Sequence, residues 1–180
     1  MNHQDHVNLL REGIPSAGGV WADFGSGSGA FTLALVELVG IQSRIYSIDM
    51  KRSALREQEQ AMHTRFPALA PEHIQYLPAD FTRQLKLPQL DGAVMANSLH
   101  FQRDKVPVLS LIRGYIKPGG RLILVEYNVD RGNLWVPYPI SYPTWEKLAY
   151  QSGFRNIRML AKRPSHFLRE IYSAICFNPE

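Results

Sequence analysis

The stretch VWADFGSGSGAFT, residues 20–32, joins a short apolar run to a helical pattern through three glycines that alternate with two serines. This order predicts a strand over 19–24, a tight loop and a helix over 30–39. A loop of this kind presents backbone N–H groups at the positive end of a helix, where an anionic group can bind. Asp23 lies two residues before the first glycine, so a negative charge is expected next to the same site.

The rest of the chain repeats the alternation of strand and helix. The runs RIYSID, HIQYLP, LDGAVMANS and RLILVEY predict strands over 44–49, 73–78, 90–98 and 121–127. Between them, helical patterns cover 53–65 and 105–116, and KPGG at 117–120 predicts a turn after the second helix. Such alternation is typical of a parallel sheet with helices on both faces, an α/β doubly wound fold.

The last part of the chain departs from this alternation. A helix is predicted near 144–152, followed by two strand candidates over 156–162 and 167–177. Only four residues, 163–166, separate them, which is too few for a parallel crossover. The sequence therefore predicts five parallel strands and an antiparallel hairpin at one edge.

Composition bounds the class of protein. The chain has 180 residues, 45% hydrophobic and 20% charged, as expected for one globular domain over 1–180 with an N-terminal helix or arm (1–17) before a core (18–180). The net charge of +4 permits an anionic partner, but it is too small to favour nucleic acid. Neither a signal-peptide core nor a run of about 20 apolar residues is found, so we expect a cytoplasmic protein without a membrane span.

The glycine-rich loop matches two ligand classes. Gly25, Gly27 and Ala30 satisfy the G-x-G-x-x-G/A pattern of dinucleotide-binding loops, but this match alone is weak. A carboxylate at Asp23 would repel a pyrophosphate and attract an ammonium group. S-adenosylmethionine carries both a carboxylate for the N–H groups and an ammonium group for Asp23, so it is the expected ligand.

Further residues at strand ends suit the adenosine part of that ligand. Asp49 ends the second predicted strand, where an acidic residue binds the ribose hydroxyls in doubly wound nucleoside sites. Met50 follows it and can lie against the adenine. In PADF, after the third strand, Asp80 can accept a hydrogen bond from the adenine amino group and Phe81 can pack on the ring.

On these motifs the chain resembles the class I S-adenosylmethionine-dependent methyltransferases over residues 20–177. The matching stretches are ADFGSGSGAFT, IYSIDM, PADF, VMANSLHF and IKPGGRLILVEY, and ANSLHF is most similar to the small-molecule branch typified by ubiquinone and menaquinone methyltransferases. The resemblance implies a Rossmann-like seven-stranded sheet of order 3-2-1-4-5-7-6 with an antiparallel last strand. The cofactor-binding residues expected from the motifs and the resemblance are Asp23, Gly25, Ser26, Gly27, Gly29, Asp49, Met50, Ala79, Asp80, Phe81, Asn97 and Ser98.

The candidate catalytic residues follow the fourth and fifth strands, because functional side chains in such sheets gather at the carboxyl ends of strands. His100 is the only histidine at such an end, and a neutral imidazole there can act as a general base. Glu126 and Tyr127 end the fifth strand. Each of the three could instead be a packing residue. His6 and its helix are expected to close the pocket from the other side.

Methyl transfer to a small-molecule acceptor, at oxygen, nitrogen or carbon, is the predicted function. An RNA or protein methyltransferase is the first alternative, since it would explain the basic charge. A non-catalytic S-adenosylmethionine-binding subunit is the second. We predict no metal site, because the clustered carboxylates that a hard metal needs are not found in the sequence.

Overall fold

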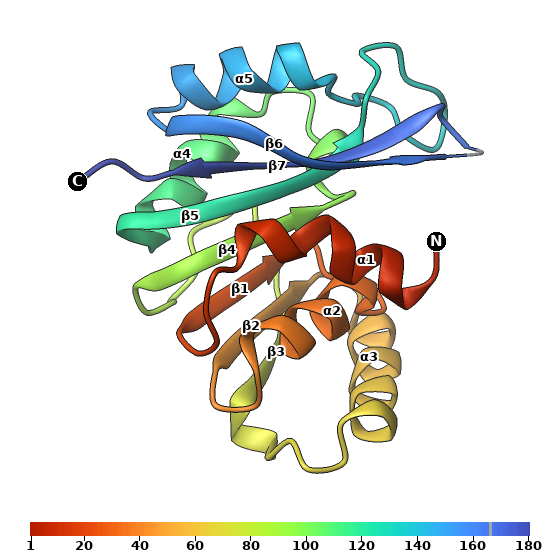
Figure 1. Ribbon diagram of the computed structural model, residues 1–180, viewed down its shortest axis with the longest axis vertical. Helices are drawn as coiled ribbons and strands as arrows, with labels where there is room; N and C mark the ends of the chain where they lie inside the picture. Colours follow the sequence, from red (N-terminus) through yellow and green to blue (C-terminus); the bar gives the residue numbers. More distant parts are fainter. Residues whose placement is uncertain (166) are drawn as a thin grey trace.

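Seven strands form one sheet in the order β3-β2-β1-β4-β5-β7-β6 in the computed structural model, which describes residues 1–165 and 167–180 (Figure 1). The first five in this order run parallel to one another, whereas β7 is antiparallel to both of its neighbours. The strands are β1 (Val20–Phe24), β2 (Arg44–Asp49), β3 (Ile74–Pro78), β4 (Leu90–Ala96), β5 (Ile116–Tyr127), β6 (Arg155–Pro164) and β7 (Glu170–Phe177). The α/β class, the strand order and the antiparallel last strand are thus confirmed.

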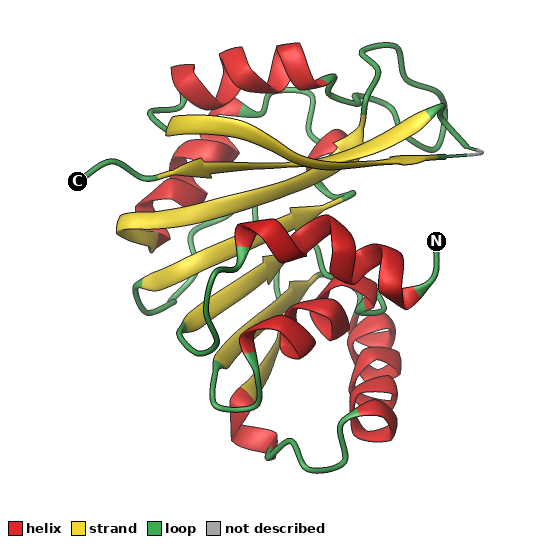
Figure 2. Cartoon of the chain, in the orientation of Figure 1, coloured by secondary structure: helices red, strands yellow, loops and turns green. Residues whose placement is uncertain are grey.

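Helices cover both faces of the sheet (Figure 2). The helices are α1 (His3–Leu10), α2 (Ala30–Val39), α3 (Arg52–Arg65), α4 (Val106–Tyr115) and α5 (Tyr142–Gln151). Buried side chains of α1, α2 and α3 form one hydrophobic cluster, and those of α4 and α5 form a second. Because β4 contributes to both clusters, its sequence LDGAVMA is apolar almost throughout instead of alternating.

The two C-terminal strands form the antiparallel hairpin that the short connection predicts. β7 lies between β5 and β6, pairing Tyr127 with Ile171 at one end and Arg121 with Phe177 at the other. The hairpin therefore extends the sheet beyond β5 (Figure 1), and Arg163 of β6 and Ile171 of β7 pair at the end of the hairpin where β5 ends at Tyr127.

Residues 117–120 differ from the sequence expectation. The helix ends at Tyr115, and the KPGG segment lies within β5 and not in a separate turn. Pairing with β4 passes from Leu90↔Ile116 directly to Gly92↔Arg121, so this segment is an irregularity in the ladder. Gly119, with φ of +75°, supplies the backbone conformation that such a bulge needs.

The five parallel strands all end at one edge of the sheet. Phe24 leads into the loop of residues 25–29, which we call the glycine loop, and Asp49 ends β2. β4 stops at Ala96 because Asn97 adopts a left-handed conformation, with φ of 51°. Over the described residues, no helix is long and apolar enough to cross a membrane.

Candidate cofactor and active site

The glycine loop is fixed to the end of β2 by its own backbone. The N–H groups of Gly25 and Ser26 both donate to the carbonyl of Ile48, over 2.8 and 3.0 Å. At Gly27 the φ is +55° and a β-carbon would project into open space. At Gly29 the φ is +91° and a β-carbon would overlap the side chain of Gln58. Gly29 therefore allows the loop to pack closely against Gln58, and the space beside Gly27 stays open.

A buried polar network beneath the loop was not predicted. The hydroxyl of Ser47 lies 2.7 Å from the hydroxyl of Ser26 and 2.9 Å from Oε1 of Gln58, and all three residues are buried. Ser47 comes from β2 and Gln58 from α3, so the network ties the loop to two elements. The signal in the sequence is a serine inside the apolar run RIYSID.

Asp23 is buried at the end of β1, with 1% of its surface exposed. Thr32 donates its hydroxyl hydrogen bond to Oδ2 over 2.6 Å, whereas Oδ1 has no hydrogen-bond partner among the described residues. Burial raises the pKa of the Asp23 carboxyl to about 7, and the charge of Asp49 adds to this rise against the opposing effect of Thr32. Oδ1 of Asn97 is also buried without a partner in the described chain.

Two cavities flank the glycine loop and share Gly25, Gly27, Ser28 and Asn97 in their walls. The smaller cavity, of about 260 Å³, is also lined by Asp23, Phe31 and His6. The larger cavity, of about 630 Å³, is lined by further residues that include Asp49, Met50, Phe81, Ser98 and Phe101. A ligand with one arm on each side of the loop fits this division.

These walls match the two ends of S-adenosylmethionine. The two unpaired acceptors in the smaller cavity, on Asp23 and Asn97, suit an ammonium group. In the larger cavity, Asp49 accepts from the N–H of Gly27 and from that of Lys51, each over 2.8 Å. Its carboxylate keeps lone pairs for further donors.

Asp80, which the sequence predicts to bind the adenine, is not among the residues that line the two cavities. Its Oδ1 accepts from the N–H and the hydroxyl of Thr82, over 2.9 and 2.6 Å, and its Oδ2 lies 3.4 Å from Nε of Arg83. These Thr82 hydrogen bonds hold the pKa of Asp80 below its usual value. The neighbouring Phe81 lines the larger cavity, and Ala79 donates its N–H to the carbonyl of Asp49.

The structure brings the three candidate catalytic residues together. Nδ1 of His100 lies 2.9 Å from Oε2 and 3.1 Å from Oε1 of Glu126, and the side chains are 3% and 0% exposed. The same carboxylate accepts the backbone N–H groups of His100 and Tyr127, over 3.1 and 3.3 Å. With Nδ1 held by the carboxylate, Nε2 is the nitrogen left to exchange a proton.

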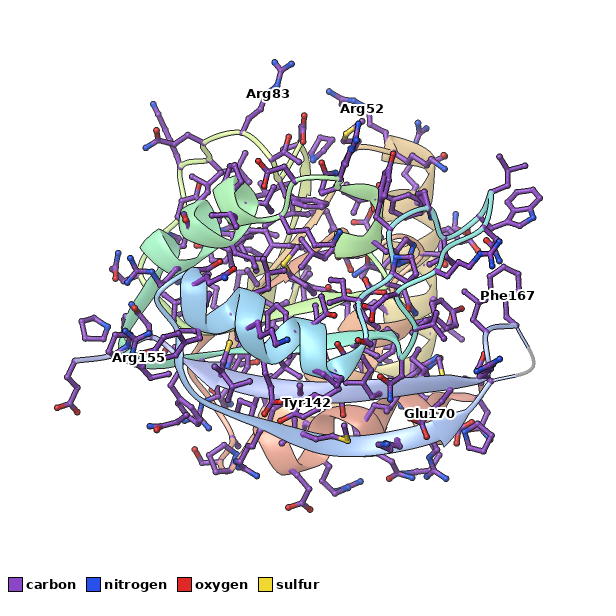
Figure 3. All side chains as sticks on the ribbon, turned by 90° about the horizontal axis from the view of Figure 1, so that it is seen from above. Arg52, Arg83, Tyr142, Arg155, Phe167 and Glu170 are labelled. Atoms are coloured by element: carbon purple, nitrogen blue, oxygen red, sulfur yellow. The ribbon has the colours of Figure 1, made fainter. Side chains whose placement is uncertain are left out.

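Aromatic rings extend from this pair toward the surface. The ring of Phe101 lies 4.3 Å and that of Tyr127 6.3 Å from the His100 ring, between centroids. The ring of Phe167, a residue labelled in Figure 3, lies 5.8 Å from that of Tyr127 between centroids. Of these rings, Phe101 also lines the larger cavity. Burial and the charge of Glu126 raise the pKa of Tyr127.

Other aromatic residues of the segment after β5 lie elsewhere. Tyr142 and Trp145 belong to α5, where Trp145 is fully buried in the core and Tyr142 packs edge-on against Tyr172. Trp135 is 71% exposed. Tyr138 alone is tied to the site, through its N–H, which donates to the carbonyl of His100 over 3.1 Å.

Comparison with known proteins assigns more than half of the chain to a methyltransferase domain. Residues 22–122, more than half of the chain, match the family model described as "Methyltransferase domain". A highly reducing polyketide synthase (aurA) of Calcarisporium arbuscula is 23% identical over 163 residues, which are 79% of this chain but only 6% of that protein.

Two solved structures illustrate the shared fold. The CurJ carbon methyltransferase superposes with a TM-score of 0.73 at 18% identity, over 92% of this chain and 50% of that one. The Haemonchus contortus phosphoethanolamine N-methyltransferase 2, solved with S-adenosyl-L-methionine, has a TM-score of 0.78 at 15% identity, over 98% of this chain and 53% of that one. Both are similar to this chain in fold, and the comparisons do not assign the chain to the ubiquinone-like branch.

Proposed function

This chain belongs to the methyltransferase-domain family, and we propose that it transfers the methyl group of S-adenosylmethionine to an acidic carbon atom of a small-molecule acceptor. The buried pair of His100, which follows β4, and Glu126, on β5, supports an acceptor that loses a proton. The chain spans 6% of the length of its polyketide synthase relative, so this proposal concerns the methyltransferase domain and not a larger assembly.

S-adenosylmethionine, the methyl donor, supplies a methyl group on a sulfonium. Asp23 and Asn97 offer their unpaired oxygens to its ammonium group, and the glycine loop offers backbone N–H groups. Asp49 and the apolar side chains of Met50 and Phe81 line the part of the site expected to hold the nucleoside. These residues bind and orient the donor, which is the main contribution to a displacement reaction.

The pair of His100 and Glu126 supports an acceptor that must lose a proton. A neutral amine is already nucleophilic through its lone pair and can lose its proton after methyl transfer. A thiolate needs no base at all. A carbon atom between two carbonyl groups becomes nucleophilic only when its C–H proton is removed. The imidazole can accept this proton at Nε2, while Glu126 fixes the ring through Nδ1 and stabilises the imidazolium that forms.

The relatives favour the same class of acceptor. The C. arbuscula relative is a polyketide synthase, and the CurJ structure is that of a carbon methyltransferase. An N-methyltransferase is also among the structural neighbours, so nitrogen acceptors are included in the test below.

The experiment measures S-adenosylhomocysteine formation with a panel of acceptors: β-diketones, β-ketoacyl thioesters, phenols and primary amines. We expect turnover with the β-dicarbonyl compounds, and NMR of the product should place the new methyl group on the carbon between the carbonyls. His100→Ala should abolish most of this turnover while still binding S-adenosylhomocysteine. Turnover confined to amines would refute the carbon acceptor without affecting the family assignment.

A further inference from the structure

We propose that His6, on α1, binds the carboxylate of the cofactor and so makes the N-terminal helix part of the donor site. This inference rests on the proposed function, because it assigns a residue to the amino-acid end of S-adenosylmethionine. It adds a ligand-binding side chain from an element that lies outside the strand–loop–helix unit of β1 and α2.

The helix α1 is held in place from both sides. Nε2 of His3 lies 2.8 Å from Oε2 of Glu37 on α2, and Nε of Arg163 on β6 lies 3.8 Å from Oδ1 of Asp5. Asn2 caps the helix by accepting from the N–H of Asp5. Figure 1 shows α1 running alongside α2. The buried residues of α1, Val7, Leu9 and Leu10, fix its rotation, and His6 lies on the smaller cavity.

The polar groups that line the smaller cavity match the charged groups of an amino acid. The buried oxygens of Asp23 and Asn97 that have no partner in the described chain suit a donor such as an ammonium group. The carboxylate next to that ammonium group needs donors of its own. Among the described residues that line this cavity, His6 is the only one with a basic side chain.

The backbone supplies the other donors on this side. The first N–H groups of α2 cannot bond within the helix, and Ala30 and Phe31 line the same cavity. A carboxylate located between these N–H groups and the imidazole of His6 would be bound from two directions. The unpaired oxygen of Asp23 gives an independent reason to place an amino acid there.

The environment of His6 also permits a purely apolar role. Its ring lies 4.7 Å from the Phe31 ring at an interplanar angle of 57°. Burial lowers the pKa of the His6 imidazole, and the N-terminal amino group and His3 lower it further against the opposing effect of Asp5. A neutral imidazole still donates one N–H, and hydrogen bonds to charged groups are stronger than those between neutral groups.

Two variants separate a hydrogen-bonding from an apolar role. His6→Phe keeps the ring against Phe31 and removes the donor, whereas His6→Gln keeps an N–H donor and removes the ring. Calorimetry would compare S-adenosylhomocysteine with an analogue in which hydrogen replaces the carboxylate. We expect His6→Phe to weaken S-adenosylhomocysteine binding about 10- to 100-fold and to leave binding of the analogue unchanged. His6→Gln should retain part of the lost affinity.

Gln4→Phe is the matched control, because Gln4 is exposed on the same helix and its side chain donates to Asn8 of that helix. It should leave the affinity for both ligands unchanged. If His6→Phe binds S-adenosylhomocysteine like the wild type, or if both ligands are weakened equally, His6 does not bind the carboxylate. A wild-type protein that binds neither ligand would instead refute the proposed function.

Discussion

Thr32 donates its hydroxyl hydrogen bond to Asp23 over 2.6 Å, from the first turn of α2 to the end of β1. The contact holds one carboxylate oxygen and leaves the other free of partners within the described residues. The side chain is therefore oriented before any ligand arrives, at the cost of burying an acidic group.

Asp23→Asn should stabilise the ligand-free protein at alkaline pH. Because the folded pKa of Asp23 is raised from 3.8 to about 7, folding holds a proton that the unfolded chain loses. The free energy of unfolding therefore falls as pH rises from about 4 to about 7, by about 4 kcal/mol at most. Asn removes this loss, so thermal denaturation at pH 8 should show a higher Tm for the variant.

The same substitution should weaken cofactor binding, because the amide offers no charge to the ammonium group. Wild-type affinity for S-adenosylhomocysteine should rise as pH increases toward 8, and this rise should be absent in Asp23→Asn. Thr32→Val is a useful comparison, since loss of its hydrogen bond removes an effect that lowers the pKa of Asp23. If the affinity of wild type and Asp23→Asn changes identically with pH, the carboxylate does not bind the ammonium group.

Glu126→Gln should impair the chemical step more than binding. The amide can no longer stabilise an imidazolium at His100, so kcat should fall by about 100-fold or more, as is typical when general-base catalysis is lost. KM for the acceptor and the affinity for S-adenosylhomocysteine should change little. Equal rates in wild type and Glu126→Gln would show that the pair of His100 and Glu126 contributes to packing and not to catalysis.

Gly27→Ala and Gly29→Ala should have different consequences. At residue 27 a methyl group enters open space beside the ligand site, so binding should weaken while stability falls only by the strain of positive φ, about 1–2 kcal/mol. At residue 29 the methyl group would overlap Gln58, so the free energy of unfolding should fall further. Urea denaturation and calorimetry on both variants check this order. A larger stability loss at residue 27 would contradict it.

Asp49→Ala should weaken cofactor binding more than Asp80→Ala does. Asp49 lines the larger cavity and also accepts the N–H of Gly27, so its loss affects both ligand and loop. A lost hydrogen bond from a ribose hydroxyl corresponds to about 5- to 150-fold in affinity. Asp80 already accepts from Thr82 within its own turn. Equal losses of cofactor affinity in the two variants would indicate that Asp80 binds the adenine, as the sequence predicts.

The helices and strands and their approximate limits could be predicted from the sequence, because hydrophobic periodicity and turn-forming residues are local signals. The strand VWADF, the glycine loop and the short connection at 163–166 led to the observed sheet, with the strand order taken from the family resemblance. The continuation of β5 through 117–120 could not be predicted, because KPGG is typical of turns and its pairing depends on a bulge opposite β4.

The positions of Asp49 and His100 at or just after strand ends could be predicted from the sequence, while their roles in binding and catalysis stay predictions. The contact between His100 and Glu126 joins positions 26 residues apart in the chain, and it depends on β4 and β5 being neighbours in register. Ser47 and Gln58 were missed for a different reason. Each is a single polar residue in an ordinary element, and only the tertiary fold shows that both lie beneath the glycine loop.

The position of β7 between β5 and β6 has a consequence for synthesis on the ribosome. Until residues 170–177 emerge, one side of β5 has no partner strand, although Leu122, Leu124 and Val125 are fully buried in the finished sheet. A nascent chain that stops short of β7 thus exposes an apolar edge strand, a template for aggregation. Strands β1 to β3 can pair much earlier, so the order of synthesis separates the formation of the two halves of the sheet in time.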